Sequence, residues 1–349
     1  MKCTIQNIAD HLGLSRNTVS KALKNSSEVS ENTRNLVIKT ASKLGYKNAT
    51  FAPPVIPASE TDSNGTILFL TRTYASDSEF WTTVLRGIES ILSNANYHLA
   101  ISIMSDSDLK QLNFPQTISD SSIKGIILVE ICDKVVCDAL SQFNLPIVSV
   151  DMPNVPFEEL NGIDVVTMES KKNLKKIINQ LIEKGAESFG FVGDLYSPNV
   201  SRGFQERYNA LSECLAEHQL PLNQKNCLLH QTPEDFRNFQ TTVNNLQAMI
   251  SLPDVFICGN DWTAIQLIYA LQFLGFQIPK DICVVGFDNI PAASRISPSL
   301  TTISTPQKYL GIAAARQILE RIQHPNCPHV FCQYETELII RNSTNIISF

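Results

Sequence analysis

The amino-acid sequence predicts a small helical head followed by an α/β body of two doubly wound parallel sheets. The first observation is charge: residues 1–50 carry a net charge of +5, whereas the rest of the 349-residue chain carries −11. The second is a change of pattern, since from Gly65 onward continuous apolar strands alternate with helical segments, as in parallel sheets covered on both faces. The third is a proline-rich stretch between the two parts, with Pro53, Pro54 and Pro57, which suits neither a helix nor a central strand.

Composition narrows the class of protein. A chain of 349 residues is too long for one hydrophobic core, so two or three domains are expected. It has no run of about 18 apolar residues, so no membrane span is expected, and its amino terminus lacks the apolar segment of a secretory signal. Nine cysteines without a C-x-x-C pair indicate reduced thiols in a cytoplasmic protein. A basic head on an acidic body predicts that the head alone meets a polyanion.

Three short helices are predicted in the head. Residues 4–12 place apolar side chains on one helical face, and Gly13 suits the end of that helix. Ser15 can cap a second helix and Ser30 a third, which Gly45 would end. The predicted inner faces comprise Ile5, Ile8, Ala9 and Leu12, then Val19, Ala22 and Leu23, then Leu36, Val37, Thr40, Ala41 and Leu44. The tight turn between the first two helices makes this a helix-turn-helix unit.

The second helix carries side chains that can read DNA. Arg16, Asn17 and Lys21 lie within about 140° of arc on the face away from the core, at about 100° per residue. Arg and Lys can donate to guanine, and Asn can bond adenine. Exposed Arg and Lys are often only solvated, but the basic charge, the turn glycine and the capped helix together favour DNA reading. Phosphate contacts are expected from Ser15, Thr18, Ser20 and Asn32.

Residues 4–46 resemble the headpiece of the LacI/GalR-type (lactose-repressor) family of transcription regulators. In that family the base-reading side chains fall on Arg16, Asn17 and Lys21 of this chain, in agreement with the helical-face argument. The resemblance implies a repressor. The matching residues are Ile8-Ala9, Gly13, Ser15, Thr18-Val19-Ser20, Val29-Ser30, Thr33-Arg34 and Leu44-Gly45-Tyr46.

The resemblance also implies a short hinge helix after the head, with a leucine that wedges into the minor groove of bound DNA. Counting from Tyr46, that position falls near Val55, between Pro54 and Pro57. An interior proline costs a helix about 3 kcal/mol. The prolines therefore predict a polyproline-like spacer in place of the hinge helix.

Two series of strands are predicted in the body, the second beginning near Gly162. Ligands of such sheets bind beyond the carboxyl ends of the strands. Several strands end in polar residues there: Asp151, Asp194, Asn260-Asp261 and Asp288-Asn289. One such residue could be an ordinary turn or cap, but a set from both series predicts a shared cleft. The sequence has no G-x-G-x-x-G, P-loop or G-x-S-x-G motif, so no nucleotide cofactor or hydrolase site is predicted.

The body resembles the same family at residues 259–261, 278–289 and 297–303, and diffusely over 65–343. The resemblance implies a two-lobed, periplasmic-binding-protein-like (type I) sensor with three crossovers. The expected organisation is a helix-turn-helix domain at 1–48, a linker at 49–64 and an effector-binding domain at 65–349. Within that domain, lobe 1 is expected at about 65–160 and 291–321, and lobe 2 at about 161–290 and 324–343.

The family's effector cleft can be carried over by position. The residues are Phe80 or Trp81, Asp151, Ser201, Arg207, Asn260 and Asp288. An aromatic face with Arg, Asn and Asp around it is typical of a sugar site. Trp81 also fits a core position. The family shows a Gly a few residues after the arginine that Arg207 matches, and this chain has none there; Arg202 also competes with Arg207 for the role.

Metal binding and catalysis find less support in the sequence. His324, Cys327, His329 and Cys332 lie within nine residues, but their spacing matches no standard zinc finger, so no metal site and no cofactor are expected. No catalytic motif is present, so an enzyme is not predicted.

The sequence therefore predicts a cytoplasmic, homodimeric DNA-binding regulator of a palindromic operator, which senses a small metabolite of the sugar class. Two alternatives stay open: a sugar-binding receptor without gene regulation, and an enzyme on the same scaffold.

Overall fold

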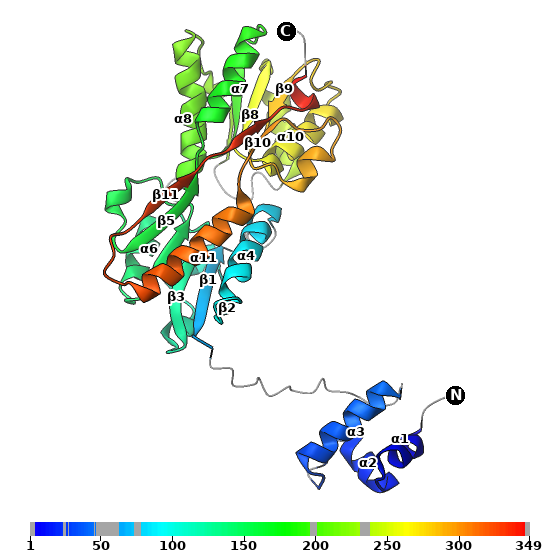
Figure 1. Ribbon diagram of the computed structural model, residues 1–349. Helices are drawn as coiled ribbons and strands as arrows, with labels where there is room; N and C mark the ends of the chain where they lie inside the picture. Colours follow the sequence, from blue (N-terminus) through cyan, green and yellow to red (C-terminus); the bar gives the residue numbers. More distant parts are fainter. Residues whose placement is uncertain are drawn as a thin grey trace. The chain divides into compact units, whose positions relative to one another are not determined.

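In the computed structural model, the described residues are 4–23, 26, 28–44, 46, 63–72, 78–195, 201–230 and 238–345. The chain divides into two units, Met1–Asp62 and Ser63–Phe349 (Figure 1), and each is described by itself. The predicted spacer at Pro53, Pro54 and Pro57 lies outside the described residues, so the absence of a hinge helix stays a prediction. Among the helices of the described ranges, none is long and apolar enough to cross a membrane.

The head consists of three helices, α1 (Ile5–Leu12), α2 (Arg16–Leu23) and α3 (Glu31–Lys43). Thr4 caps α1 in a reciprocal arrangement with Asn7, and Gly13 ends it at φ 65°, a conformation that favours glycine. The Ser15 hydroxyl accepts the Thr18 amide at 3.0 Å, as the sequence predicts. The small core comprises Ile8, Ala9, Val19, Ala22, Val29, Val37 and Ala41.

The predicted inner face of α3 is partly wrong. Val37, Thr40 and Ala41 are buried, but Leu36 is 51% exposed and Leu44 is 36% exposed. Leu36 lies about 100° around the helix from Val37. Two eight-residue helices cover only a narrow stripe of α3, so Leu36 falls outside it.

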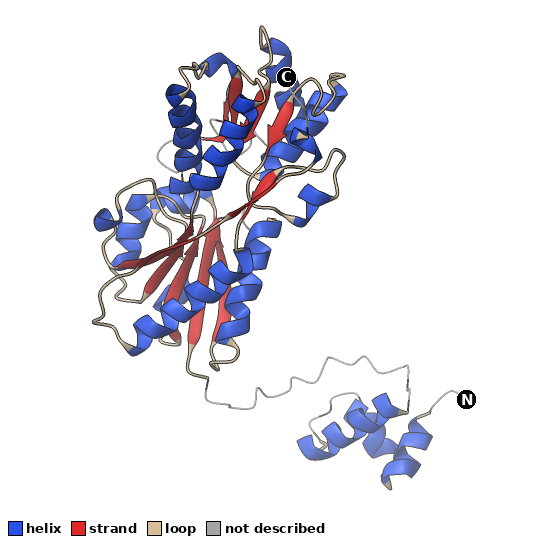
Figure 2. Cartoon of the chain, turned by 45° about the horizontal axis from the view of Figure 1, so that its top comes forward, coloured by secondary structure: helices blue, strands red, loops and turns tan. Residues whose placement is uncertain are grey.

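Lobe 1 of the sensor is built on a six-stranded parallel sheet in the order β11-β5-β4-β3-β1-β2. Its strands are β1 (Thr66–Arg72), β2 (His98–Met104), β3 (Ile123–Val129), β4 (Ile147–Val150), β5 (Ile163–Met168) and β11 (Phe331–Tyr334). Its helices are α4 (Glu79–Leu92), α5 (Asp106–Gln111), α6 (Lys134–Ser141) and α11 (Gln307–Gln323). Helices lie on both faces of the sheet (Figure 2), which explains why β1, β3, β4 and β5 are mostly apolar and almost entirely buried.

Helices α4 and α11 lie side by side on lobe 1 (Figure 1). The close approach depends on Gly311, where an added Cβ would lie 2.0 Å from the Val84 carbonyl oxygen. Helix α11 is thereby fixed to lobe 1, although it follows lobe 2 in the sequence.

Lobe 2 is built on a four-stranded parallel sheet in the order β7-β6-β8-β9. Its strands are β6 (Phe189–Asp194), β7 (Leu228–His230), β8 (Val255–Cys258) and β9 (Cys283–Val285). Its helices are α7 (Lys172–Glu183), α8 (Arg202–Glu217), α9 (Phe239–Ala248) and α10 (Asp261–Phe273). The two lobes match the doubly wound class that the sequence predicts.

Three crossovers join the lobes, and their positions correct the predicted lobe boundaries. Strand β5 pairs with β4 in lobe 1, so residues 163–168 do not begin lobe 2 as expected. Residues 299–304 lie against lobe 2, where the Gly286 amide donates to the Thr301 carbonyl at 2.9 Å. Strand β11 pairs with β5 in lobe 1, whereas the prediction placed residues 324–343 in lobe 2.

The carboxyl-terminal part of that segment does return to lobe 2. Strand β12 (Glu337–Ile339) pairs antiparallel with β10 (Thr302–Ser304), and the Ser343 hydroxyl donates to the Val284 carbonyl at 2.6 Å. The prediction failed because an apolar strand fits either sheet. What assigns β5 to lobe 1 is a contact distant in sequence, the buried pair of Asp164 with Arg321 of α11.

Candidate functional site

The candidate DNA-reading face of the head lies on α2. Arg16 and Asn17 are exposed at its first turn, and Lys21 is 41% exposed one turn later. Val19 and Ala22 occupy the opposite, buried side. The structure therefore presents the three predicted base-reading side chains away from the core, as a major-groove reader requires.

The side chains predicted to contact phosphates differ in their exposure and in the hydrogen bonds that they already make. The Ser15 and Thr18 hydroxyls bond each other at 2.8 Å while Ser15 caps α2. Ser20 is partly buried on the same helix, and Asn32 lies in the first turn of α3, with its side chain outside the described residues. Helix caps place backbone N–H groups toward solvent, where a phosphate can accept from them.

Two contacts of the head were not predicted. Lys21 forms an ion pair with Glu28 from the loop between α2 and α3, and this hydrogen bond lowers the pKa of the Glu28 carboxyl. The Arg34 guanidinium donates to the carbonyls of Ser26 and Val29 at 2.8 and 3.0 Å. Arg34 therefore holds the loop that carries Glu28.

In the sensor, strand ends from both lobes bring acidic side chains together. Glu130 directly follows β3, Asp151 directly follows β4, and Asp288 lies just beyond β9. Their φ values are 57°, 71° and 115°, respectively. Left-handed backbone is unusual for residues other than glycine and often marks functional positions. The charges of Glu130 and Asp151 both act on Asp288, so the three groups face one region. Glu130 was not among the predicted site residues, although its place at a strand end could have identified it.

Arg207 of α8 lies within this group. Its guanidinium donates to the Gly259 carbonyl at 2.6 Å and lies 3.7 Å from the centre of the Phe287 ring. Only 3% of the residue is exposed, and burial lowers its pKa against the opposing charges of Asp288 and Asp151. Among the described residues its buried Nε has no hydrogen-bond partner. The neighbouring Arg202 pairs with Glu206 at 2.8 Å, so the structure favours Arg207 over Arg202 for the predicted role.

The lobes touch at this point. The Arg202 amide donates to the Met152 carbonyl at 3.0 Å, and Pro153 forms a β-bridge with Ser201. Ser201 also caps α8 by accepting the Phe204 amide at 3.3 Å. Burial raises the pKa of Asp151, while hydrogen bonds from the Met152 amide and the Ser201 hydroxyl oppose that rise. Asp151 of lobe 1 and Ser201 of lobe 2 thus meet across the boundary between the lobes.

The remaining predicted residues are less closely involved. The Asn260 side chain caps α10 by accepting the Thr263 amide at 2.9 Å. Phe80 is a buried core residue at the start of α4, and Trp81 packs edge-on against it and against the same core. Phe80 is therefore a core residue, and Trp81, only partly buried, is the better candidate of the two for stacking on a sugar.

Two buried groups near the cleft were not among the predicted effector-binding residues, although Asp261 was predicted at a strand end. Arg72 ends β1 and donates to Asp106 at 2.7 Å. Asp261 is fully buried, accepting the Thr302 hydroxyl at 2.5 Å and the Ile290 amide at 2.9 Å, and burial raises its pKa to about 7. Asp261 ties α10 to the crossover strand β10, so it supports the hinge rather than the ligand.

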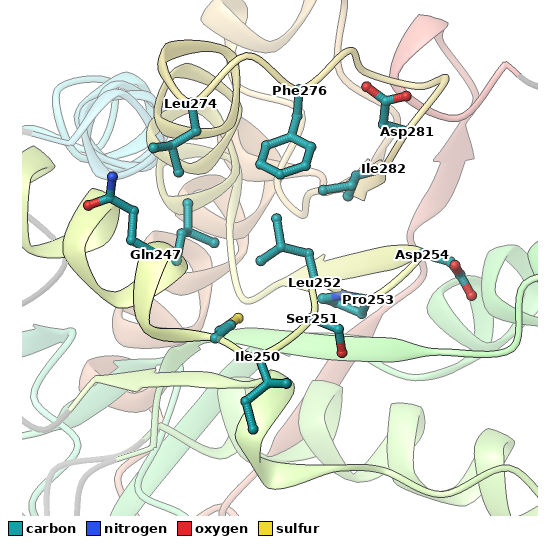
Figure 3. A pocket seen from close by; sticks show the side chains of 12 residues that line it. Gln247, Ile250, Ser251, Leu252, Pro253, Asp254, Leu274, Phe276, Asp281 and Ile282 are labelled. Atoms are coloured by element: carbon teal, nitrogen blue, oxygen red, sulfur yellow. The ribbon is translucent and has the colours of Figure 1, made fainter.

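A separate hollow of about 470 Å³ lies at the other end of lobe 2 (Figure 3). Apolar side chains line it, including Leu252, Leu274 and Phe276, with Asp254 and Asp281 at its edge. It lies beside the amino-terminal ends of β8 and β9. Ligands of parallel sheets bind at the carboxyl ends, so this hollow is not assigned to the effector.

The His/Cys-rich turn at residues 324–332 folds around a buried ion pair. The Arg321 guanidinium binds both carboxylate oxygens of Asp164, at 2.8 and 3.0 Å, and the Pro328 carbonyl at 2.8 Å. The His329 Nδ1 lies 3.3 Å from Asp164. Within the described ranges, no three His, Cys, Asp or Glu side chains converge as metal ligands.

Known proteins match both units of the chain. Bacterial regulatory proteins of the lacI family match residues 4–48, and the periplasmic binding protein-like domain matches residues 178–344. The chain belongs to the lacI family. It is a bacterial regulatory protein with an amino-terminal DNA-binding unit and a two-lobed sensor.

Relatives of this lacI-family protein match along its whole length. It is 26% identical to the transcriptional repressor PurR of Photobacterium profundum and 27% identical to the ribose operon repressor of Haemophilus influenzae, over 97% of this chain and 98% of each relative. The lac repressor dimer bound to operator and anti-inducer shares its fold, with a TM-score of 0.66 at 19% identity over 99% of both chains. An Enterococcus faecium regulator with bound ribose has a TM-score of 0.65 at 25% identity, over 80% of this chain and 98% of its own.

Proposed function

We propose that this lacI-family protein is a transcription repressor whose operator affinity depends on a sugar-class effector bound between its two lobes. The observation that carries the proposal is the joining, in one chain, of an outward-facing α2 to a sensor with polar groups gathered where its lobes meet. Arg16, Asn17 and Lys21 would read bases. Asp151, Ser201, Arg207, Asn260 and Asp288, with Trp81, would hold the effector.

The switch would act through lobe closure. The Met152–Arg202 hydrogen bond and the Pro153–Ser201 bridge join the lobes at the edge of the cleft. A ligand that binds both lobes stabilises the closed arrangement, because it gains contacts there that the open arrangement lacks. Closure in a dimer would then change the separation of the two heads.

A dimer is supported by apolar surface that each lobe leaves uncovered. Helix α10 exposes Trp262, Tyr269 and Phe273, which are 39%, 44% and 69% exposed. The edge strand β2 exposes Ile101 and Ile103 at 55% and 48%. Such exposed aromatic and aliphatic groups are typical of protein interfaces. Two-fold pairing would match an inverted repeat in the operator.

The family assignment supports a cytoplasmic location, where DNA is, and a regulatory rather than an enzymatic role. Its relatives are named as repressors, and the cleft groups are arranged for holding a ligand by hydrogen bonds. A receptor without gene regulation would have no use for the basic head.

The test is selection of DNA by the full chain from a randomised library, followed by binding measurements on the selected sequence. Wild-type protein is expected to enrich an inverted repeat. Arg16→Ala and Lys21→Ala should each weaken binding by about 1–3 kcal/mol and relax the preference at one position of each half-site. Lys110→Ala, on lobe 1, is the matched control and should leave binding unchanged. Enrichment of no sequence would overturn the regulator assignment, and unchanged preference in both variants would overturn the assignment of the bases.

A further inference from the structure

One residue of the proposed effector site is held by both lobes through its main chain. Asp288 lies just beyond β9 of lobe 2, yet its carbonyl oxygen accepts a hydrogen bond from Gln307, the first residue of α11. We propose that Gln307 couples the effector site to lobe 1, because it ties the main chain of Asp288 to a helix that moves with that lobe. This inference rests on the proposed function, since it takes Asp288 as an effector-binding residue.

The loop that carries Asp288 is fixed to lobe 2 on either side of that residue. The Asp261 amide donates to the Phe287 carbonyl at 2.7 Å, and the Asp261 carboxylate accepts the Ile290 amide at 2.9 Å. Between these two contacts Asp288 adopts a φ of 115°, which is unfavourable for a residue with a side chain. Contacts to the main chain of Asp288 are therefore what keep its carboxyl group in place.

Both main-chain groups of Asp288 are bonded to the segment that leads from lobe 2 into α11. Its carbonyl oxygen lies 2.6 Å from the Gln307 Nε2 and 3.1 Å from the Thr305 hydroxyl, and its amide donates to the Ile303 carbonyl at 2.8 Å. Gln307 is only 8% exposed, so little water can replace its hydrogen bond. Removing the Gln307 donor would leave a hydrogen bond of Asp288 unmade.

Helix α11 can transmit this hold because its first turns are fixed on lobe 1 (Figure 1). An added Cβ at Gly87 of α4 would lie 2.2 Å from the Lys308 carbonyl oxygen, and one at Gly311 would lie 2.0 Å from the Val84 carbonyl oxygen. Backbones packed this closely move together. A movement of lobe 1 therefore displaces Gln307 relative to the loop of lobe 2 that carries Asp288.

The coupling acts in both directions, because linkage between two equilibria is reciprocal. A ligand that fixes the Asp288 carboxyl group favours the lobe arrangement in which Gln307 reaches the Asp288 carbonyl. An arrangement that withdraws Gln307 releases Asp288 and weakens ligand binding. Gln307 is thus a positioning residue, and its role requires no contact with the ligand.

Hydrogen exchange of the full chain, measured by mass spectrometry without ligand or DNA, reports how firmly Asp288 is held. Gln307→Met keeps the length of the side chain but removes the donor. The amides of residues 287–290 should therefore exchange about three- to tenfold faster than in wild type. Thr305→Val removes the more distant donor and should produce a smaller increase.

The matched control is Gln317→Met, which removes a glutamine donor from the same helix. Gln317 donates to Asp164 of lobe 1 at 3.1 Å, so its loss should leave the exchange of residues 287–290 unchanged. If Gln307 served only to fill space, Gln307→Met would behave like this control.

Gly87→Ala tests whether lobe 1 acts on Asp288 through Gln307. The added methyl group must displace the start of α11 at Lys308, so the amides of residues 287–290 should exchange faster in the wild-type background. In the Gln307→Met background the same change should add less than about a further twofold, because the link is already broken.

Two results would overturn the proposal: a wild-type exchange rate at residues 287–290 in Gln307→Met, or an equal increase from Gly87→Ala in both backgrounds. If Gly87→Ala does not fold, the comparison of Gln307→Met with Gln317→Met still decides whether Gln307 holds Asp288. Neither measurement uses operator DNA or an effector, so its failure is distinguishable from a failure of the proposed function.

Discussion

Two regions of the sensor bury aspartates in opposite ways. At the far side of lobe 1, Asp164 is fully buried and receives Arg321 on both oxygens, together with the Val330 amide at 2.8 Å and Gln317 at 3.1 Å. Burial raises its pKa, but these hydrogen bonds outweigh burial and the pKa is lowered. In the cleft region, Asp151 and Asp261 are buried and Asp288 is partly buried, all with fewer donors, and their pKa values are raised.

The difference separates a structural role from a functional one. A buried carboxylate that is fully hydrogen-bonded to a cation holds elements together and leaves nothing for a ligand. A buried carboxylate without such a partner keeps hydrogen-bonding capacity at a cost in stability, which is accepted mainly at sites that bind or move. The comparison therefore locates the cleft independently of any relative.

The largest effect on stability is expected from breaking the fully hydrogen-bonded pair of Asp164 and Arg321. Arg321→Ala leaves the Asp164 charge buried and removes the donor that also binds the Pro328 carbonyl. The sensor should lose about 3–5 kcal/mol of unfolding free energy, measured by urea denaturation followed by circular dichroism. The exposed Arg295 provides the control, since Arg295→Ala should cost less than about 0.5 kcal/mol. Equal losses in the two variants would show that the pair has no special role.

A smaller effect on stability is expected from Asp261, and its contribution changes with pH in a defined direction. Its folded pKa of about 7 is above the ordinary value, so the folded protein holds a proton that the unfolded chain has lost. Its contribution is therefore complete below about pH 4 and declines as the pH rises toward 7, by up to about 4 kcal/mol. Asp164 acts in the opposite direction: its contribution is present at neutral pH and is lost as the pH falls.

Asp261→Asn should abolish that decline. Stability measured by urea denaturation at intervals from pH 4.5 to 8 should become flatter in the variant, although it loses about 1–3 kcal/mol at pH 5 because one hydrogen bond to Thr302 or Ile290 is lost. Asp138→Asn, at a partly exposed position of α6 where the carboxylate pairs with Lys134, should keep the wild-type slope. A variant slope identical to wild type would show that Asp261 does not titrate in this range.

The same contrast explains how much the sequence could predict. The head follows from residues close together in the chain: Ser15 caps α2, Gly13 ends α1, and Arg16 and Asn17 face outward as expected. The doubly wound strands follow from apolar runs, and the strand-end rule led to Asp151 and Asp288. Each of these inferences uses neighbours within about ten residues.

The predictions that were wrong or missing depend on contacts that the sequence does not show. The assignment of β5 to lobe 2 was wrong because Arg321, which fixes Asp164, is 157 positions later. Glu130 follows β3 and the strand-end rule could have identified it, but only the fold brings it near Asp288. The pairing of Lys21 with Glu28 lies within one domain, yet the bend of the loop that Arg34 holds is what brings them together.

The smallest effect on stability is expected at that last pair, which is a surface counterpart of Asp164 and Arg321. Lys21 and Glu28 are 41% and 66% exposed, so water and salt screen their attraction. Glu28→Gln should therefore leave the melting temperature of the head unchanged.

The effect of Glu28→Gln should appear on DNA binding instead, because the change frees the Lys21 ammonium and removes a negative charge beside the phosphates. Operator affinity measured by fluorescence anisotropy should rise several-fold at low salt and converge with wild type as salt increases. Asp10→Asn removes the same charge from α1 and should produce a smaller rise. Weaker binding by Glu28→Gln would contradict this expectation and indicate that Glu28 itself accepts a hydrogen bond from a base, as a carboxylate can from cytosine. In either outcome the exposed pair acts through its partner outside the protein, whereas the buried pair acts within the fold.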